Sequence, residues 1–202
     1  MAERLLDVLE EARTRGLVGP GPVETHLRHA ATIAELAGPP PAAFLDLGSG
    51  GGIPGLVLAQ VWAHAHGVLL ESRERRCTFL EDALVVLGLK PRLKVACGRA
   101  EDRARDPELR GSVDLVVARG FGPPAVTAEC GVGFLRPGGR LVVSEPQGSP
   151  EGRWPEAGLG ELGLMGPEIR RTEEVTVAVL TLVHPDERWP RRSGIPAKRR
   201  LW

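Results

Sequence analysis

A cluster of glycines directly follows a short apolar segment, and this pairing limits the folds that the chain can adopt. Residues 42–47 are almost all apolar and have the length of a buried strand. Residues 48–52 include four glycines, and Pro54 then opens a helical pattern that extends to about residue 63. A strand, a glycine-rich turn and a helix in this order are typical of the first unit of an open α/β sheet.

Strand and helix patterns alternate along the rest of the chain. Predicted strands cover residues 67–71, 93–97, 113–118, 140–144 and 175–183, and predicted helices cover 2–15, 23–37 and 73–87, with a weaker helix ending near Leu135. Because such alternation requires crossover connections, we expect a Rossmann-like α/β fold with a mostly parallel sheet and helices on both faces. Residues 148–166, rich in Gly, Pro and Glu, predict no defined element.

Composition divides the chain into a short helical segment at 1–40, the α/β domain at 41–184 and a basic tail at 185–202. There are 26 basic and 26 acidic residues, so the net charge by itself indicates no polyanionic partner. Apolar runs are too short to span a bilayer, and residues 1–4 do not begin a signal peptide. We therefore expect a cytoplasmic protein, of undefined oligomeric state.

The three cysteines, Cys77, Cys97 and Cys130, are far apart in the sequence and form no Cys-x-x-Cys pair. An odd, sparse set of this kind predicts neither a disulfide framework nor a zinc site. The five histidines include no pair with a catalytic partner or a complete set of metal ligands, so we interpret them as solvated or capping side chains. We expect no metal and no general base.

The glycine loop brings bare backbone to the carboxyl end of the first strand, where open α/β sheets bind their ligands. Gly50 and Gly52 are the positions at which backbone approach to a ligand is expected, and residues 50–55 also match the dinucleotide pattern G-x-G-x-x-G. A nicotinamide or flavin enzyme, an S-adenosylmethionine enzyme and a tight turn without a ligand are all compatible with this loop.

Acidic residues after the next two strands favour a nucleoside cofactor. Glu71 ends the second predicted strand, where a carboxylate accepts hydrogen bonds from ribose hydroxyls. Glu101 and Asp102 follow the third strand, beside the expected place of an adenine ring, although exposed loop carboxylates would have the same pattern. Because the chain has no room for the second domain of most dehydrogenases, a methyltransferase is favoured over an oxidoreductase.

Residues 46–56, Asp-Leu-Gly-Ser-Gly-Gly-Gly-Ile-Pro-Gly-Leu, resemble the cofactor loop of the guanine-N7 methyltransferases of small-subunit ribosomal RNA, also called the glucose-inhibited division protein B family. The ending Gly-Ile-Pro-Gly is the distinctive part of this loop. Shorter matches extend the similarity from about residue 16 to residue 198, and they cover residues 69–72, 98–102, 117–119, 135–140 and 189–198.

The resemblance implies an enzyme that binds S-adenosylmethionine and methylates guanine N7 in small-subunit ribosomal RNA, either as naked RNA or in the assembled subunit. The family's cofactor contacts fall on Gly48, Ile53, Ala100, Glu101 and Arg119. Because N7 of neutral guanine carries a lone pair and needs no deprotonation, catalysis can depend on proximity and orientation. We therefore assign no catalytic side chain.

The basic tail combines cations with tryptophan, a composition that suits RNA through phosphate neutralisation and base stacking. A solvated terminus would have the same composition. Phe121 is a further candidate for stacking on the target base, or for packing within its loop. The candidate RNA contacts in the tail are Arg191, Arg192, Lys198, Arg199 and Arg200.

Two departures from the family pattern leave the substrate open. Glu145 stands near the usual position of a cation, and it should repel RNA phosphate unless it faces away or Arg119 or Arg140 neutralises it. The segment before the first strand is also shorter than is usual in the family. Three alternatives therefore remain: a paralogue with another substrate, an NAD-binding oxidoreductase, and a non-catalytic module that binds the cofactor or RNA.

Overall fold

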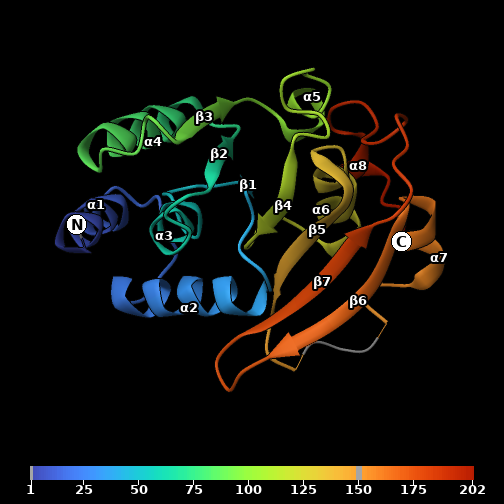
Figure 1. Cartoon of the computed structure of the whole chain (residues 1–202), viewed down its shortest axis with the longest axis horizontal. Helices are drawn as coiled ribbons and strands as arrows, with labels where there is room; N and C mark the ends of the chain where they lie inside the picture. The colour runs from blue at the N-terminus through green and yellow to red at the C-terminus, as the bar shows by residue number, and fades with distance from the viewer. Residues whose placement is uncertain (1, 149–151) are drawn as a thin grey trace.

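The computed structural model describes residues 2–148 and 152–202 and contains a seven-stranded sheet of order β3-β2-β1-β4-β5-β7-β6 (Figure 1). β1 to β5 are parallel, and β7 runs antiparallel to both β5 and β6. The strands are β1 (Ala43–Leu47), β2 (His66–Glu71), β3 (Leu93–Cys97), β4 (Val113–Ala118), β5 (Leu135–Glu145), β6 (Leu164–Arg171) and β7 (Thr176–Leu182).

The direction of strand addition reverses at β1. The chain adds β2 and β3 on one side of β1, and then returns to add β4 and β5 on the other side. Leu47 at the end of β1 lies opposite Leu70 of β2 and Ala118 of β4, so the loops that follow these strands meet at one edge. Such a reversal leaves a crevice outside the carboxyl ends of the strands, which is where ligands bind in open α/β sheets.

Helices cover both faces of the sheet, as predicted (Figure 1). Adjacent residues of a strand point to opposite faces, so Phe44 joins the core beneath the first set of helices and Leu45 joins the core on the other face. The first set is α1 (Ala2–Thr14), α2 (Val23–Leu36), α3 (Gly55–Val61) and α4 (Glu74–Val86), and the second is α5 (Ala100–Arg103), α6 (Pro124–Val132), α7 (Glu156–Glu161) and α8 (Ile195–Lys198).

The two ends of the chain pack into these same cores. Leu9 of α1 and Ile33 of α2 are fully buried in the core that also contains Leu56 of α3. Trp189 of the tail is 5% exposed and belongs to the core on the other face. The part of 148–166 that the structure describes also holds elements that the sequence did not predict, namely α7 and the start of β6. α7 has only six residues, two of them glycine, and β6 is mostly exposed and is interrupted by Gly166 and Pro167, so neither has a clear periodicity.

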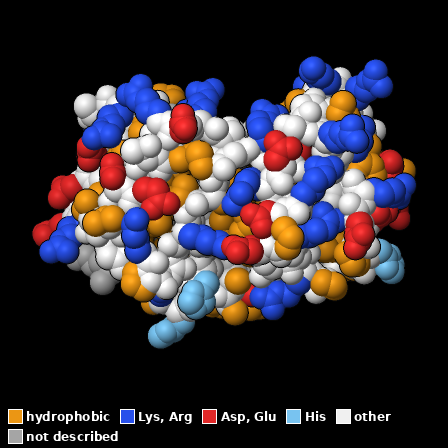
Figure 2. All heavy atoms as spheres, turned by 90° about the horizontal axis from the view of Figure 1, so that it is seen from above, with side chains coloured by type: hydrophobic (Ala, Val, Ile, Leu, Met, Phe, Trp, Pro, Cys, Tyr) orange, Lys and Arg blue, Asp and Glu red, His pale blue; other side chains and the backbone are white. Residues whose placement is uncertain are grey.

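No helix in the two described stretches, 2–148 and 152–202, has the length and hydrophobicity needed to cross a bilayer. Charged side chains of both signs cover the face seen in Figure 2, and Lys and Arg are numerous on both sides of a notch in its outline. This mixture of positive and negative side chains agrees with the equal numbers of basic and acidic residues in the sequence.

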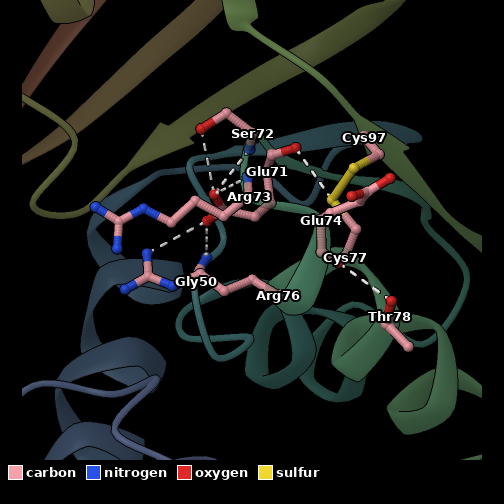
Figure 3. The surroundings of a disulfide bond; sticks show 9 residues. All are labelled: Gly50, Glu71, Ser72, Arg73, Glu74, Arg76, Cys77, Thr78 and Cys97. Atoms are coloured by element: carbon pink, nitrogen blue, oxygen red, sulfur yellow. Dashed lines mark hydrogen bonds and ion pairs between the residues drawn. A yellow bond between two sulfur atoms is a disulfide. The ribbon is translucent and has the colours of Figure 1, made fainter.

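One expectation about the cysteines is wrong. Cys77 in the first turns of α4 and Cys97 at the end of β3 form a disulfide, with Cα atoms 5.8 Å apart (Figure 3). The sequence separation of 20 residues hides this proximity, which arises because Glu71, just before α4, is paired with Cys97 across the β2–β3 ladder. Cys130 is free and buried, and burial raises the pKa of its thiol far above the usual range.

The disulfide leads to a prediction about stability. Cys97→Ser should lower the free energy of unfolding by about 3 kcal/mol, the chain-entropy value for a loop of roughly this size. Because Cys97 is exposed, its replacement leaves no buried cavity. Urea unfolding of the wild type with a reductant should reproduce the loss seen in the variant. Equal stability of the wild type with and without reductant would contradict the pairing.

A candidate cofactor site at the carboxyl edge of the sheet

The glycine loop after β1 has a backbone that only glycine adopts readily. Gly48, Gly50 and Gly52 have φ of 79°, 57° and 96°, in the left-handed region. A Cβ atom at Gly48 would lie 2.7 Å from the ring of Phe121, and one at Gly52 would lie 2.4 Å from a methyl group of Leu56. Gly48 therefore permits close approach at the crevice, whereas Gly52 permits packing of the loop against α3.

The Glu71 carboxylate holds this loop against the start of α4 (Figure 3). Its Oε2 accepts a hydrogen bond from the Gly50 N–H at 3.0 Å, and its Oε1 accepts from the N–H groups of Ser72 and Arg73 at 2.7 and 2.9 Å. Arg76 lies 3.5 Å from Oε2. A carboxylate has about four acceptor positions, so most of those of Glu71 are used by the protein.

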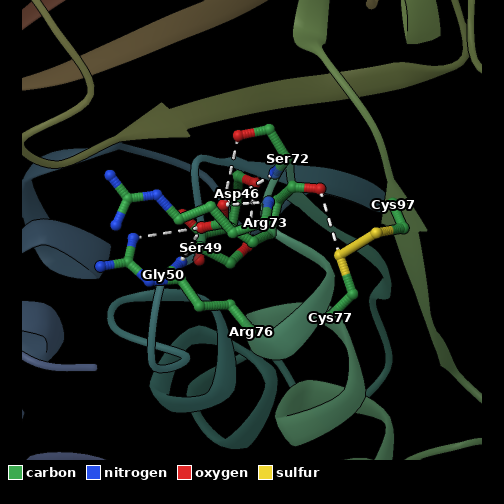
Figure 4. Close-up of polar contacts among 9 residues, drawn as sticks. Asp46, Ser49, Gly50, Ser72, Arg73, Arg76, Cys77 and Cys97 are labelled. Carbon is green, nitrogen blue, oxygen red and sulfur yellow. Dashed lines mark hydrogen bonds and ion pairs between the residues drawn. A yellow bond between two sulfur atoms is a disulfide. The ribbon is translucent and has the colours of Figure 1, made fainter. Parts of the chain in front are cut away.

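Asp46 is only 1% exposed and lies beside Ser49 of the same loop (Figure 4). Its Oδ2 accepts a hydrogen bond from the Gly55 N–H at 2.9 Å, while its Oδ1 has no partner among the residues that the structure describes. Burial raises the pKa of Asp46 to about 7, against the smaller opposing effects of hydrogen bonds and of Arg119. The carboxyl group that accepts the Gly55 N–H therefore holds its proton at mildly acidic pH.

A cavity of about 440 Å³ opens at the ends of β1 to β4, a size that suits a nucleoside-sized ligand. The tail closes one side of this cavity, and Phe121 lies in its lining. Among the residues predicted from the sequence, it brings together Gly48, Glu71, Ala100, Glu101 and Arg200.

A second cavity, of about 310 Å³, adjoins the first and shares Gly48, Arg76 and Gly120 with it. It contains the other predicted cofactor residues, Gly50, Ile53 and Arg119, together with residues 17–19 from the segment before α2. Gly52 lines neither cavity. The predicted site is therefore a pair of adjoining cavities that share Gly48 of the glycine loop in their linings.

His26 was interpreted from the sequence as solvated or capping, and that interpretation is wrong. Its side chain is buried, and its Nδ1 lies 2.8 Å from a guanidinium nitrogen of Arg119. Because arginine can only donate, Nδ1 accepts, and Nε2 then carries the proton and donates to the Gly19 carbonyl at 3.2 Å. Through this contact His26 orients Arg119, whose pKa is lowered by burial.

Glu101 also lines the first cavity and is only 3% exposed. Its Oε1 accepts hydrogen bonds from the Gly194 N–H at 3.0 Å and from Arg99 at 2.9 Å. Burial acts to raise the pKa of Glu101, but these hydrogen bonds outweigh it, so the pKa is lower than usual. The carboxylate is ionised and turned toward the tail.

Two charged residues have different surroundings from those expected. Arg191, a predicted RNA contact, forms two hydrogen bonds of 2.8 and 2.6 Å with the carboxylate of buried Glu129. Glu145 is 7% exposed and pairs with Arg153 at 2.6 Å, rather than with Arg119 or Arg140. Because this carboxylate is buried and paired with Arg153, we no longer expect it to repel RNA phosphate.

Arg192, Lys198, Arg199 and Arg200, the other predicted RNA contacts, are exposed. No group of three His, Cys, Asp or Glu side chains in the described part of the chain is placed to bind a metal ion.

Asp46 provides a test of this electrostatic arrangement. Between about pH 4 and pH 7 the folded protein retains a proton that the unfolded chain releases, so this group lowers the free energy of unfolding as pH rises. Asp46→Asn keeps an oxygen for the Gly55 N–H and carries no charge, so it should remove this pH dependence. Urea unfolding at about pH 5 and about pH 8 should show a relative gain for the variant at the higher pH. The same difference from wild type at both values would contradict the raised pKa.

Comparison with known proteins now identifies the family. The family model described as rRNA small subunit methyltransferase G matches residues 16–149. The proteins named ribosomal RNA small subunit methyltransferase G in Moorella thermoacetica and Roseiflexus castenholzii are both 35% identical to this chain. The matches cover 81% and 88% of this chain, and 71% and 78% of those proteins.

Solved structures show the fold. Geranyl diphosphate methyltransferase, solved with GPP and sinefungin, superimposes with a TM-score of 0.58 at 12% identity over 77% of each chain. The pyocyanin biosynthetic protein PhzM gives a TM-score of 0.60 at 18% identity, over 77% of this chain and 54% of its own. At less than 25% identity, these likenesses concern the fold alone. The family model and the sequence matches show that the chain belongs to the rRNA small subunit methyltransferase G family of S-adenosylmethionine-dependent methyltransferases.

Proposed function

We propose that this protein transfers the methyl group of S-adenosylmethionine to N7 of a guanine in small-subunit ribosomal RNA. The observation that carries the proposal is the pair of adjoining cavities at the point where strand order reverses, with Gly48 in the lining of both. Relatives named ribosomal RNA small subunit methyltransferase G match most of the chain. We expect the reaction to take place in the cytoplasm, where ribosomal subunits are found.

The residues of the site fit the cofactor. Gly48, Gly50 and Ile53 provide bare backbone and one apolar side chain, and Glu71 brings a carboxylate to the wall of the first cavity. Ala100, the first residue of α5, lies in the same wall. A nucleoside fits such a site because polar groups fix its orientation while apolar groups cover its faces. When bound, the cofactor supplies an electrophilic methyl group on a sulfonium.

The chain's own residues have a binding and orienting role in this chemistry. N7 of neutral guanine already has a lone pair, so no side chain is needed to remove a proton before attack. Arg119, fixed by His26, lies in the second cavity, and the ring of Phe121 lies in the first. Phe121 offers a face on which a splayed base can stack. The proposal therefore places the target base where these two cavities meet.

Methyl transfer to RNA tests the function. Small subunits and naked ribosomal RNA, both from a strain that lacks this methylation, would be incubated with the protein and radiolabelled S-adenosylmethionine. We expect label on a guanine, released by the depurination and strand cleavage that N7-methylation permits. Transfer to only one of the two preparations would identify the form of the substrate. Tight cofactor binding without transfer to either would contradict the proposal and favour a paralogue or a non-catalytic module.

The glycine loop gives a sharp prediction about the cofactor. Gly48→Ala places a methyl group against Phe121 at the crevice, and should weaken S-adenosylmethionine binding by about tenfold or more, measured by calorimetry. Gly88→Ala is the matched control, since Gly88 also has positive φ but has open space around its Cβ position and is remote from the cavities. The control should share the stability loss and keep wild-type affinity. Equal affinities for both variants would exclude the loop from the site.

The tail gives a prediction about RNA. Replacing the exposed cations Arg192, Lys198 and Arg199 by alanine should weaken RNA binding and reduce the slope of log affinity against log salt by about 2, as expected for three lost phosphate contacts. Arg191→Ala should instead lower the free energy of unfolding, because it leaves Glu129 buried without its cation. A triple variant with the wild-type salt slope would show that these cations do not contact RNA.

A further inference from the structure

The C-terminal tail, residues 185–202, is docked on the protein. Trp189 is 5% exposed, and its indole N–H donates to the Glu161 carbonyl at 3.0 Å. The indole N–H of Trp202 donates to the Arg153 carbonyl, also at 3.0 Å. Both tryptophans therefore attach the tail to the region around α7.

Cations of the α5 region also hold the tail backbone. Arg105 donates to the Pro190 carbonyl at 2.5 Å, and Arg110 donates to the Trp189 carbonyl at 3.0 Å. Arg191 of the tail also donates two hydrogen bonds to the carboxylate of Glu129 in α6. These charge-assisted bonds fix the path of the tail up to residue 191.

Beyond residue 191, the tail contributes residues to the wall of the first cavity. The Gly194 N–H donates to the Glu101 carboxylate, and α8 follows directly. Ala197 of α8 and Arg200, just after this helix, line the first cavity, as do Ala100 and Glu101. The carboxylate of Glu101 is nearly inaccessible and accepts hydrogen bonds from Gly194 and Arg99. It therefore holds the tail through Gly194.

We propose that residues 194–200 form one wall of the S-adenosylmethionine cavity, and that Glu101 is a positioning residue that holds this wall in place. The proposal rests on the proposed function, since it concerns the same cofactor site. It gives Arg200 a role as a hydrogen-bond donor to the bound nucleoside, and it gives the tail a role other than RNA binding. Deletion of the tail should then affect cofactor affinity and not only RNA affinity.

Calorimetric titration with S-adenosylmethionine, in the absence of RNA, tests the wall. Arg200→Ala should raise the dissociation constant by about tenfold, as expected for loss of a hydrogen bond from a charged group. Arg188→Ala is the matched control, because Arg188 is an exposed tail arginine that pairs with Asp186 and lies outside the cavity lining. Equal affinity in the two variants would overturn the role of Arg200.

A double-mutant cycle tests how Glu101 acts. One change is Glu101→Ala, and the other is truncation after Ser193, which keeps Trp189 and the Arg191–Glu129 pair. If Glu101 works through the tail, its replacement should weaken binding in the full chain and have almost no further effect in the truncated chain. Additive losses would show direct contact with the cofactor and overturn the positioning role. Glu101→Gln, which keeps an oxygen for the Gly194 N–H, should recover most of the affinity.

Thermal unfolding of each variant accompanies the titrations. If the truncated chain does not fold, the comparison of Arg200→Ala with Arg188→Ala and of Glu101→Gln with Glu101→Ala decides the proposal, and equal affinities within each pair would overturn it. Failure of the wild type to bind S-adenosylmethionine would contradict the proposed function itself. Wild-type binding together with unaltered binding by every tail variant would contradict only the role of the tail.

Discussion

The geometry of the cofactor site depends on the hydrogen bonds that the buried carboxylate of Glu71 accepts. It joins two segments that are separate in the sequence, since one oxygen accepts from Gly50 in the loop after β1 and the other accepts from Ser72 and Arg73 before α4. Removing one partner from a buried hydrogen bond leaves the other unsatisfied, at a cost of about 1–3 kcal/mol. The carboxylate thereby holds Gly50, which lines the second cavity, and lies 3.5 Å from Arg76, which borders both cavities.

Buried carboxylates also determine which of the many arginines remain available. Glu129, Glu101 and Glu145 are almost inaccessible, and each has a cation as a partner. A buried charge without a partner is strongly destabilising, so these pairs are part of the folded structure rather than of a substrate surface. Not all basic residues of the tail therefore contribute free positive charge to the surface, since Arg191 is paired with buried Glu129. The remaining exposed cations of the tail are the ones that can meet RNA phosphates.

The local parts of the site could be predicted because they depend on short stretches of sequence. The strand at 42–47, the glycines after it and the helix that starts near Pro54 follow one another in the chain, and the structure places β1 and α3 there. The disulfide between Cys77 and Cys97 and the contact between His26 and Arg119 could not be predicted in this way. Their partners are 20 and 93 residues apart, and neither pair lies within one periodic element.

By itself, the sequence determined the α/β class, the sheet with helices on both faces, the glycine loop and the family, because hydrophobic period and glycine placement act over a few residues. Only the tertiary structure decided which charges are free and which are paired. Arg191 and Glu129 are 62 residues apart, and Gly194 meets Glu101 across 93 residues. Such contacts depend on how the tail packs against α5 and α6, and that packing is set by burial of Trp189 in the core rather than by any local pattern.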